Sequence, residues 1–346
     1  MPVCLCGERT CKLSNTLMKE VIMKTVKFAL RAGEATPSVF SAVPEEFTIS
    51  DGDGLHHYIK VGGFNERIVT SGTIDGAQVT LTGDFFQDIT YSMPVQIAGQ
   101  RFIALDRYPK AVYNGLLNSV GKKLSNFLPA LVWNNPGAFI PRPERSYLLR
   151  PKAGARGMGF INLNTGKSIQ YVLQTLALHA SKSPEDYLQA LAETGIVLSD
   201  EGMNDTHDLV ATVNTGYDVV EFIPNVTAEY RIMTDYTGQP VLVVERTRTM
   251  TKAGFHQARG CGQSVDKAVP FKDWEPSGDA GTIKAQLVDF FTTLARPVNS
   301  FDLFITEQGE WGFFEACSEF GSTSLPDGWL AMQARQLVHH TATCCL

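Results

Sequence analysis

The sequence has no long apolar stretch and no excess of positive charge. No segment reaches the roughly 18 uninterrupted apolar residues of a membrane-spanning helix, so a membrane protein is not predicted. The 30 lysines and arginines are outnumbered by 36 aspartates and glutamates, which gives a net charge of −6. A general nucleic-acid-binding protein normally carries a basic surface, so nucleic acid is not expected as a partner. The 44% hydrophobic and 19% charged content predicts a globular chain rather than a disordered one.

Cysteine is scarce, and most of it lies near the two ends of the chain. Cys4, Cys6 and Cys11 stand near the start, and Cys344 and Cys345 stand at the end. An odd total of seven in a long chain without a recognisable signal peptide favours reduced thiols and a cytoplasmic protein. The three N-terminal cysteines lack a fourth ligand at suitable spacing, so a structural zinc site is not the favoured interpretation.

Two common nucleotide-binding motifs, GxxxxGK[ST] and GxGxxG, are also missing. Residues 148–160, LLRPKAGARGMGF, nevertheless suit phosphate binding, because a strand ends in two cations and three glycines follow. Glycine lets backbone amides approach phosphate oxygens, and the cations add charge. A solvent-exposed hairpin loop uses the same residue types, so the segment alone leaves both interpretations open. The residues concerned are Arg150, Lys152, Gly154, Gly157 and Gly159.

Hydrophobic periodicity predicts a mixture of strands and helices. Short β-like runs punctuated by glycine and aspartate extend from about 24 to 106. Residues 109–128 and 282–295 repeat apolar side chains every three to four positions, as amphipathic helices do. Further helices are predicted at 167–181 and 184–194, and strands at 146–150, 218–223, 229–234 and 240–247. This pattern predicts an α+β fold.

The stretch 300–321, SFDLFITEQGEWGFFEACSEFG, carries the strongest functional signal. It predicts two antiparallel strands joined by a turn at 307–310, with Asp302 and Glu315 side by side far from the turn. Paired carboxylates on a rigid sheet suit Mg²⁺, which usually binds together with phosphates. The alternative is a hairpin with ordinary surface acids. Against it, Glu315 follows two phenylalanines in an apolar strand, where an unpaired carboxylate is costly to bury.

The segment 218–234, DVVEFIPNVTAEYRIMT, predicts an apolar strand, a turn and a second strand. Glu229 and Arg231 are two residues apart on the second strand and therefore share a face. The strand 219–223 offers apolar side chains and backbone polar groups to a planar base. An edge hairpin with a surface ion pair would look the same in sequence.

The segment 243–263, VVERTRTMTKAGFHQARGCGQ, is rich in cations for an acidic protein. Such a cluster needs an anionic partner, either within the chain or outside it. Pairing with nearby acids and binding of phosphate therefore both remain open. His256 could act as a general base, although a single loop histidine is more often structural. The cations are Arg246, Arg248, Lys252 and Arg259.

Taken in order, these motifs resemble the ATP-grasp family of carboxylate–amine ligases over residues 145–325. The resemblance implies an α+β fold with two α/β lobes sandwiching a nucleotide cleft, preceded by a smaller β-rich N-terminal lobe. It divides the chain into a flexible N-terminal extension at 1–22, an N-terminal lobe at 23–140, a nucleotide-binding and catalytic region at 141–330, and a C-terminal helix and tail at 331–346.

The resemblance also implies roles for individual residues. Arg150 stands where the family usually has lysine, contacting phosphates with Lys152, and the glycines form a loop that closes over them. Glu221, Phe222 and Ile223 belong to the strand whose backbone and acid read the adenine and its neighbouring ribose, and Glu229 of the Glu-x-Arg strand is also assigned to nucleotide binding. Catalysis is assigned to Arg231 and Arg259, and Mg²⁺ binding to Asp302, Glu315 and Glu319. The family's Glu-x-Asn ending is replaced here by Glu315-Ala316-Cys317, a soft thiol that Mg²⁺ does not favour, and Glu319 is a candidate substitute.

The implied function is an ATP- and Mg²⁺-dependent ligase that activates a carboxylate as an acyl phosphate for attack by an amine or thiol. Its substrates would be small molecules or peptides, and a homodimer is possible. Two alternatives remain: a phosphotransferase using the same cleft, and a non-catalytic nucleotide-binding protein with a degenerate site. The ligase interpretation predicts that Asp302→Asn or Glu315→Gln abolishes turnover while the protein still folds.

Overall fold

The structure is a computed structural model that describes residues 23–31, 42–52, 54–64, 72–74, 77–79, 92–97, 100–105, 110–152, 159–163, 166–199, 210, 216–251, 254–258, 268–276, 280–296, 298–317 and 325–344. The predicted extension at 1–22 and the predicted site residues Gly154, Gly157, Arg259 and Glu319 lie outside these ranges. Within the described ranges, no helix is both long enough and apolar enough to cross a membrane.

The N-terminal part is built from strands, as the sequence predicts. β1 (Met23–Arg31) runs parallel to β3 (Gly54–Phe64), and β2 (Glu46–Asp51) pairs antiparallel with the other edge of β3. Two antiparallel ribbons follow, formed by β4 (Gly72–Ile74) with β5 (Ala77–Val79) and by β6 (Ser92–Ile97) with β7 (Gln100–Leu105). β2 and β6 lie within the predicted β-like region but outside its individual apolar runs, which are TVKFAL, HHYIKVGG, RIVTSGTI, AQVTLTG and RFIAL.

The larger sheet has the strand order β16-β13-β12-β17-β18, and every neighbouring pair is antiparallel. One face packs against α6 (Ala280–Leu294), which confirms the helix predicted at 282–295, and against α2 (Lys110–Gly121). Leu287, Phe290 and Phe291 of α6 are fully buried there, together with Phe301 of β17. The strands are β12 (Val226–Thr234), β13 (Pro240–Glu245), β16 (Val269–Pro270), β17 (Ser300–Thr306) and β18 (Trp311–Cys317).

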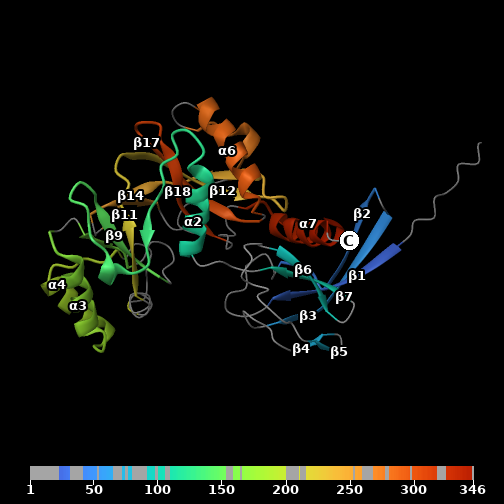
Figure 1. The fold of residues 1–346 in the computed structure, drawn as a ribbon, viewed down its shortest axis with the longest axis horizontal. Helices are drawn as coiled ribbons and strands as arrows, with labels where there is room; N and C mark the ends of the chain where they lie inside the picture. The colour runs from blue at the N-terminus through green and yellow to red at the C-terminus, as the bar shows by residue number, and fades with distance from the viewer. Residues whose placement is uncertain are drawn as a thin grey trace, which may run out of the picture.

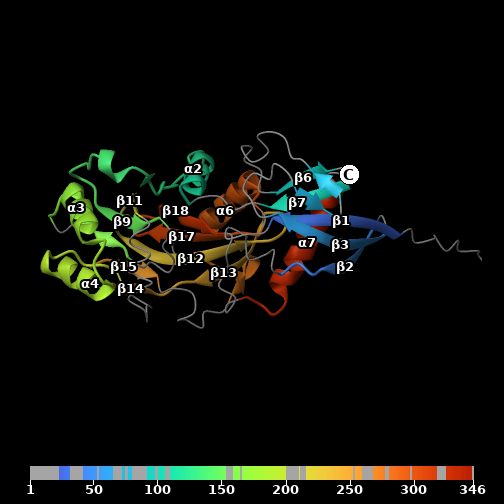
Figure 2. The same cartoon turned by 90° about the horizontal axis from the view of Figure 1, so that it is seen from below.

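The smaller sheet has the strand order β10-β9-β11-β8 and lies beside the larger sheet in both views (Figures 1 and 2). α3 (Ile169–His179) and α4 (Pro184–Glu193) cover one of its faces, and the predicted helices at 167–181 and 184–194 are therefore confirmed. Ser168 and Ser183 cap these helices through their hydroxyl groups. The strands are β8 (Val132–Trp133), β9 (Tyr147–Pro151), β10 (Ile161–Asn162) and β11 (Tyr217–Glu221).

The C-terminal helix α7 (Trp329–Cys344) connects the N-terminal sheet to the larger sheet. Trp329 packs with Met233 and Val244 of the larger sheet, whereas Leu337 packs in a cluster that contains Tyr58 of β3. In Figure 1 the helix lies between the two parts of the molecule. The remaining elements are the hairpin β14 (Arg248–Met250) and β15 (His256–Ala258) and the short 3₁₀ turns Pro136–Ala138 and Phe271–Asp273.

Gly312 is a position where the β17–β18 hairpin tolerates no side chain. A Cβ atom there would overlap the carbonyl oxygen of Leu128 and approach the Phe304 ring to 2.7 Å. Gly312→Ala is therefore expected to lower the free energy of unfolding by about 2 kcal/mol or more, because a packed backbone must shift. Gly281→Ala is the matched control, since a Cβ atom in α6 would meet nothing within 4 Å and alanine favours helix. Equal stability of the two variants in urea denaturation would contradict this packing.

Candidate functional site

The site lies where the side of the smaller sheet that faces away from α3 and α4 meets the side of the larger sheet that faces away from α6. Strand alternation places Leu149 and Val219 of the smaller sheet against α3 and α4, so Leu148, Arg150 and Val220 point to the opposite face. On the larger sheet, residues at positions 228, 230, 232, 301 and 303 fill the core beneath α6. Their neighbours therefore line the other face, which carries Glu229, Arg231, Arg246, Asp302 and Glu315.

Arg150 of β9 bridges the two sheets. Its Nη1 lies 3.9 Å from Oε2 of Glu315 on β18, and its Nη2 lies 3.9 Å from Oδ2 of Asp218 on β11. Both distances are too long for hydrogen bonds. The residue is only 6% exposed, and among the described residues its Nε and Nη2 atoms have no hydrogen-bond partner. A buried guanidinium with unsatisfied donors is energetically costly. Arg150 is therefore well suited to bind an anion that accepts hydrogen bonds from it.

Asp302 is held by two arginines on the same face. Arg231 donates from Nε to Oδ1 at 2.7 Å and from Nη2 to Oδ2 at 2.9 Å, and Arg246 donates from Nη1 to Oδ2 at 2.8 Å. Burial alone favours the protonated acid, but the two guanidinium groups outweigh it and hold the pKa of Asp302 well below its usual range. Asp302 is therefore ionised and positions two cations side by side.

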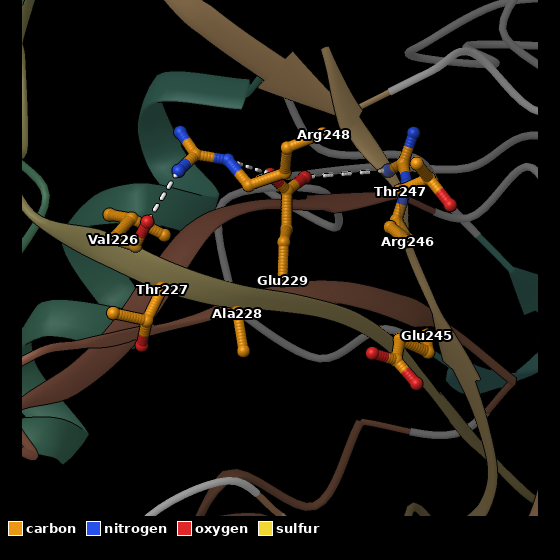
Figure 3. Close-up of a pocket in the computed structure, with 8 residues that line it drawn as sticks. All are labelled: Val226, Thr227, Ala228, Glu229, Glu245, Arg246, Thr247 and Arg248. Atoms are coloured by element: carbon orange, nitrogen blue, oxygen red, sulfur yellow. Dashed lines mark hydrogen bonds and ion pairs between the residues drawn. The ribbon is translucent and has the colours of Figure 1, made fainter.

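A pocket of about 420 Å³ lies along the edge of this face (Figure 3). Glu229 is buried in its wall, with Arg248 Nε 3.4 Å and Arg246 Nη1 3.9 Å from its carboxylate oxygens. Arg248 also donates from Nη1 to the carbonyl of Val226 at 2.7 Å. Burial raises the pKa of Glu229 to about 7, although Arg246 and the other arginines oppose the rise. The pocket thus combines two cations with an acid that titrates near neutral pH.

Replacement of Glu229 with glutamine is expected to change how stability depends on pH. The pKa of Glu229 is about 7 in the folded protein, against the ordinary value of 4.5 in the unfolded chain. Between these two pH values the folded form therefore keeps a proton that the unfolded form has released. The free energy of unfolding should therefore fall as pH rises from 4.5 to 7, by up to about 1.4 kcal/mol per pH unit. Glu229→Gln should flatten that slope in urea denaturation. An unchanged slope would show that Glu229 does not titrate there.

Apolar side chains border Arg150 on the smaller sheet. Leu148 and Phe255 are buried together there, with Phe160, Val220 and Phe222 packed against them. Phe222 therefore faces the same side as Arg150, as an adenine-side residue should, while its N–H donates to the carbonyl of Ser146. Ile223 is buried next to Phe304 of the larger sheet, where it joins the two walls. An apolar surface beside a buried cation suits a base and its phosphates.

Glu221 does not fit its predicted role of reading the ribose with its carboxylate. It is the register partner of Tyr147, so its side chain lies on the α3 side of the sheet, opposite to Arg150. Its Oε1 accepts a hydrogen bond of 2.6 Å from Nη1 of Arg145. The physical reason is the two-residue period of a strand, which sends Glu221 and Val220 to opposite faces.

The described ends of the glycine loop contribute little to an anion site. The Gly159 amide donates to the carbonyl of Ser199 at 2.7 Å, and the Gly159 carbonyl accepts from the hydroxyl of Tyr217, so this glycine is engaged within its own lobe. Its φ of 72° does confirm the need for glycine. Lys152 is exposed, and its amide donates to the carbonyl of Gly216.

The predicted pair of metal-binding acids is brought together as expected. Asp302 and Glu315 are register partners on β17 and β18, and Cys317 follows on the same face opposite Ser300. Among the described side chains, no group of three or more His, Cys, Asp or Glu could hold a metal ion. Mg²⁺ that arrives with phosphates needs only one or two carboxylates, and half-buried Glu315 fits that need. Asp302 fits less well because two arginines occupy its oxygens.

Sequence reasoning missed the charged partners of three predicted site residues. Asp218 pairs with Arg150, Arg145 holds Glu221, and Arg246 shares Asp302 with Arg231. Arg246 stood out only as one member of a cationic cluster. Asp218 and Arg145 gave no signal, because their partners are set by strand register rather than by sequence spacing.

Comparison with known proteins yields matches to solved structures alone. No family model matches the chain, and no curated protein matches it. The chain is similar to the D-cycloserine synthetase DcsG at 15% identity and a TM-score of 0.38, over 67% of this chain and 70% of that one. It is similar to the ATP-grasp ligase PsnB at 14% identity and a TM-score of 0.32, over 67% of this chain and 60% of that one.

A third solved structure is the D-alanine–D-alanine ligase from Bacillus anthracis, complexed with ATP. It is 9% identical with a TM-score of 0.34, and the match spans 68% of this chain and 66% of that one. Each of these three proteins is named as a ligase or a synthetase. The likeness is loose, so no residue role is transferred from these structures. The proposed roles rest on the geometry of this chain, except that those of Arg259, Glu319 and the glycine loop rest on the motif order alone.

Proposed function

We propose that the protein is an ATP-dependent ligase that converts a carboxylate to an acyl phosphate, which an amine then attacks. The single observation that carries this proposal is Arg150, a buried guanidinium with unsatisfied donors between two sheets. Phosphate oxygens are the acceptors that match its planar fork. The apolar surface of Leu148, Val220 and Phe222 beside it offers a place for the base.

Each residue has a chemical task in this scheme. Arg150 binds nucleotide phosphates, and Lys152 and the glycine loop are assigned to the same task. Arg231 and Arg246, aligned by Asp302, stabilise the charge that develops on the transferred phosphoryl group, and Arg259 is assigned to the same task. Phe222, Ile223 and the neighbouring backbone, but not the Glu221 carboxylate, hold the base. Glu229 lines the pocket that adjoins these cations.

Magnesium would be held by Glu315 and Asp302, with Glu319 as a further candidate. Bound there, it would neutralise negative charge on the nucleotide phosphates. Cys317, where the resembled family has asparagine, is a softer ligand than Mg²⁺ prefers. A nucleotide supplies further oxygens, so the loss of this one ligand does not by itself remove the site.

The reaction balances without any other reagent. A substrate carboxylate oxygen attacks the γ-phosphorus of ATP. The bond between that phosphorus and the oxygen that links it to the β-phosphate breaks, and ADP leaves with the electron pair. The amine nitrogen then attacks the acyl carbon and loses a proton, and inorganic phosphate departs with the electron pair of the acyl–oxygen bond. The protein's part is to position the groups and neutralise charge. Small-molecule and peptide carboxylates both remain candidate substrates.

ADP release in the presence of pooled carboxylates and amines, with and without hydroxylamine, tests this proposal. An acyl phosphate is expected to yield a hydroxamate that mass spectrometry identifies. Transfer to a non-carboxylate acceptor would instead indicate a phosphotransferase.

Two observations favour a non-catalytic nucleotide-binding protein as a second candidate. Asp302 already gives its oxygens to two arginines, and Cys317 replaces a harder ligand. Nucleotide binding without ADP formation under every substrate mixture would support this candidate and exclude the ligase.

A further inference from the structure

Arg150 is contacted by two carboxylates, one from its own sheet and one from the other sheet. Asp218 sits on β11, directly opposite Arg150 in the register of the same sheet. Glu315 sits on β18 of the other sheet, yet its distance from the guanidinium is the same 3.9 Å. Asp218 therefore moves with Arg150, whereas the contact with Glu315 must break if the two walls part.

The two acids also differ in exposure. The Asp218 side chain is 9% exposed and that of Glu315 is 25% exposed, against 7% for Arg150. Solvent can stabilise Glu315 after it leaves Arg150, whereas release of Asp218 would strand a buried charge. Of the two contacts, the one across the cleft is the less costly to break.

A phosphate would satisfy Arg150 better than Glu315 does. Both present contacts are ion pairs without hydrogen bonds: Glu315 lies nearest Nη1, the atom that a phosphate replacing it would take, and Nη2 has no hydrogen-bond partner within the described structure. A phosphate can accept two parallel hydrogen bonds from a guanidinium fork. Phosphate and Glu315 carry charge of the same sign, so they compete for the same cation.

We infer that Glu315 occupies Arg150 in the nucleotide-free protein and yields it to a nucleotide phosphate, while Asp218 stays with Arg150 in both states. This inference rests on the proposed function. Glu315 is then a competitor of the nucleotide before binding and a carboxylate beside its phosphates afterwards. The contact is one link between the two sheets, in addition to the packing of Ile223 against Phe304.

The test is ADP binding without divalent metal, measured by calorimetry in EDTA at constant ionic strength. Glu315→Gln should bind ADP about tenfold more tightly than the wild type, the factor expected if roughly nine molecules in ten hold the contact with Glu315. Asp218→Asn is the matched control, because it removes the same charge at the same distance from Arg150. It should tighten binding by less than about threefold, since Asp218 does not leave when phosphate arrives.

An equal increase in ADP affinity in Glu315→Gln and Asp218→Asn would show a general effect of removing negative charge and would overturn the inference. An unchanged or weaker affinity of Glu315→Gln would overturn it as well. In both cases the nucleotide site itself would stand. A wild-type protein that binds no nucleotide, with or without Mg²⁺, would instead remove the proposed function and the inference together.

Discussion

Replacing Arg150 with glutamine is expected to weaken binding of ATP by at least about a hundredfold and to abolish turnover. Glutamine keeps much of the side-chain length but loses the positive charge and the guanidinium fork. The loss of charge-assisted hydrogen bonds to a phosphate costs about 3 kcal/mol, which corresponds to that factor. Calorimetry with a non-hydrolysable ATP analogue and Mg²⁺ measures the effect directly.

Arg142→Gln is the matched control for this experiment. Arg142 is exposed in the segment before β9, so its replacement removes the same charge without touching the inter-sheet face. Its affinity for the analogue should stay within about twofold of wild type, because exposed charges are screened by salt. If Arg150→Gln bound the analogue as tightly as Arg142→Gln, Arg150 would not be the phosphate ligand.

Replacing Asp302 with asparagine is expected to lower the free energy of unfolding by roughly 3–5 kcal/mol, in addition to abolishing turnover. Removal of the carboxylate leaves the guanidinium groups of Arg231 and Arg246 without their shared acid in a buried setting. The sequence alone predicted a variant that lost activity but folded normally. The structure revises that expectation, because Asp302 supports the site as well as belonging to it.

The loss of stability in Asp302→Asn is expected to depend on pH. The pKa of Asp302 is depressed in the folded protein, so its contribution is fully present above the ordinary value of 3.8 and is lost as pH falls below it. The stability gap between wild type and Asp302→Asn should therefore be widest at neutral pH and shrink in acid. Urea denaturation at several pH values measures it.

Asp289→Asn, at an exposed position on α6, serves as the control for Asp302→Asn. Its free energy of unfolding should stay within about 0.5 kcal/mol of wild type, as is usual for a surface substitution. An Asp302→Asn protein as stable as this control at neutral pH would contradict the arrangement of Asp302 between two arginines.

Local pattern was enough to predict much of the fold. The turn at 307–310 and the apolar residues around it fixed the pairing of Asp302 with Glu315, which the register confirms. The spacing of apolar residues in 282–295 likewise predicted α6 and its buried face. Such elements are predictable because their contacts lie within one hairpin or one helix.

The parts of the site that escaped prediction depend on long-range pairing. Arg231 and Arg246 reach Asp302 across 71 and 56 residues, which only the order β13-β12-β17 brings together. Glu221 was assigned to the wrong side of its sheet because the phase of a strand is set by its partners. A shift of one residue exchanges the two faces, and sequence alone does not report which face a helix covers.

The most direct test of the account is a crystal structure of the protein with a non-hydrolysable ATP analogue and Mg²⁺. If ATP binds as proposed, phosphate oxygens lie within hydrogen-bonding distance of Arg150, the base lies against Phe222, and Glu315 turns away from the guanidinium toward the phosphates. A nucleotide bound elsewhere, with Arg150 still between Asp218 and Glu315, would contradict it.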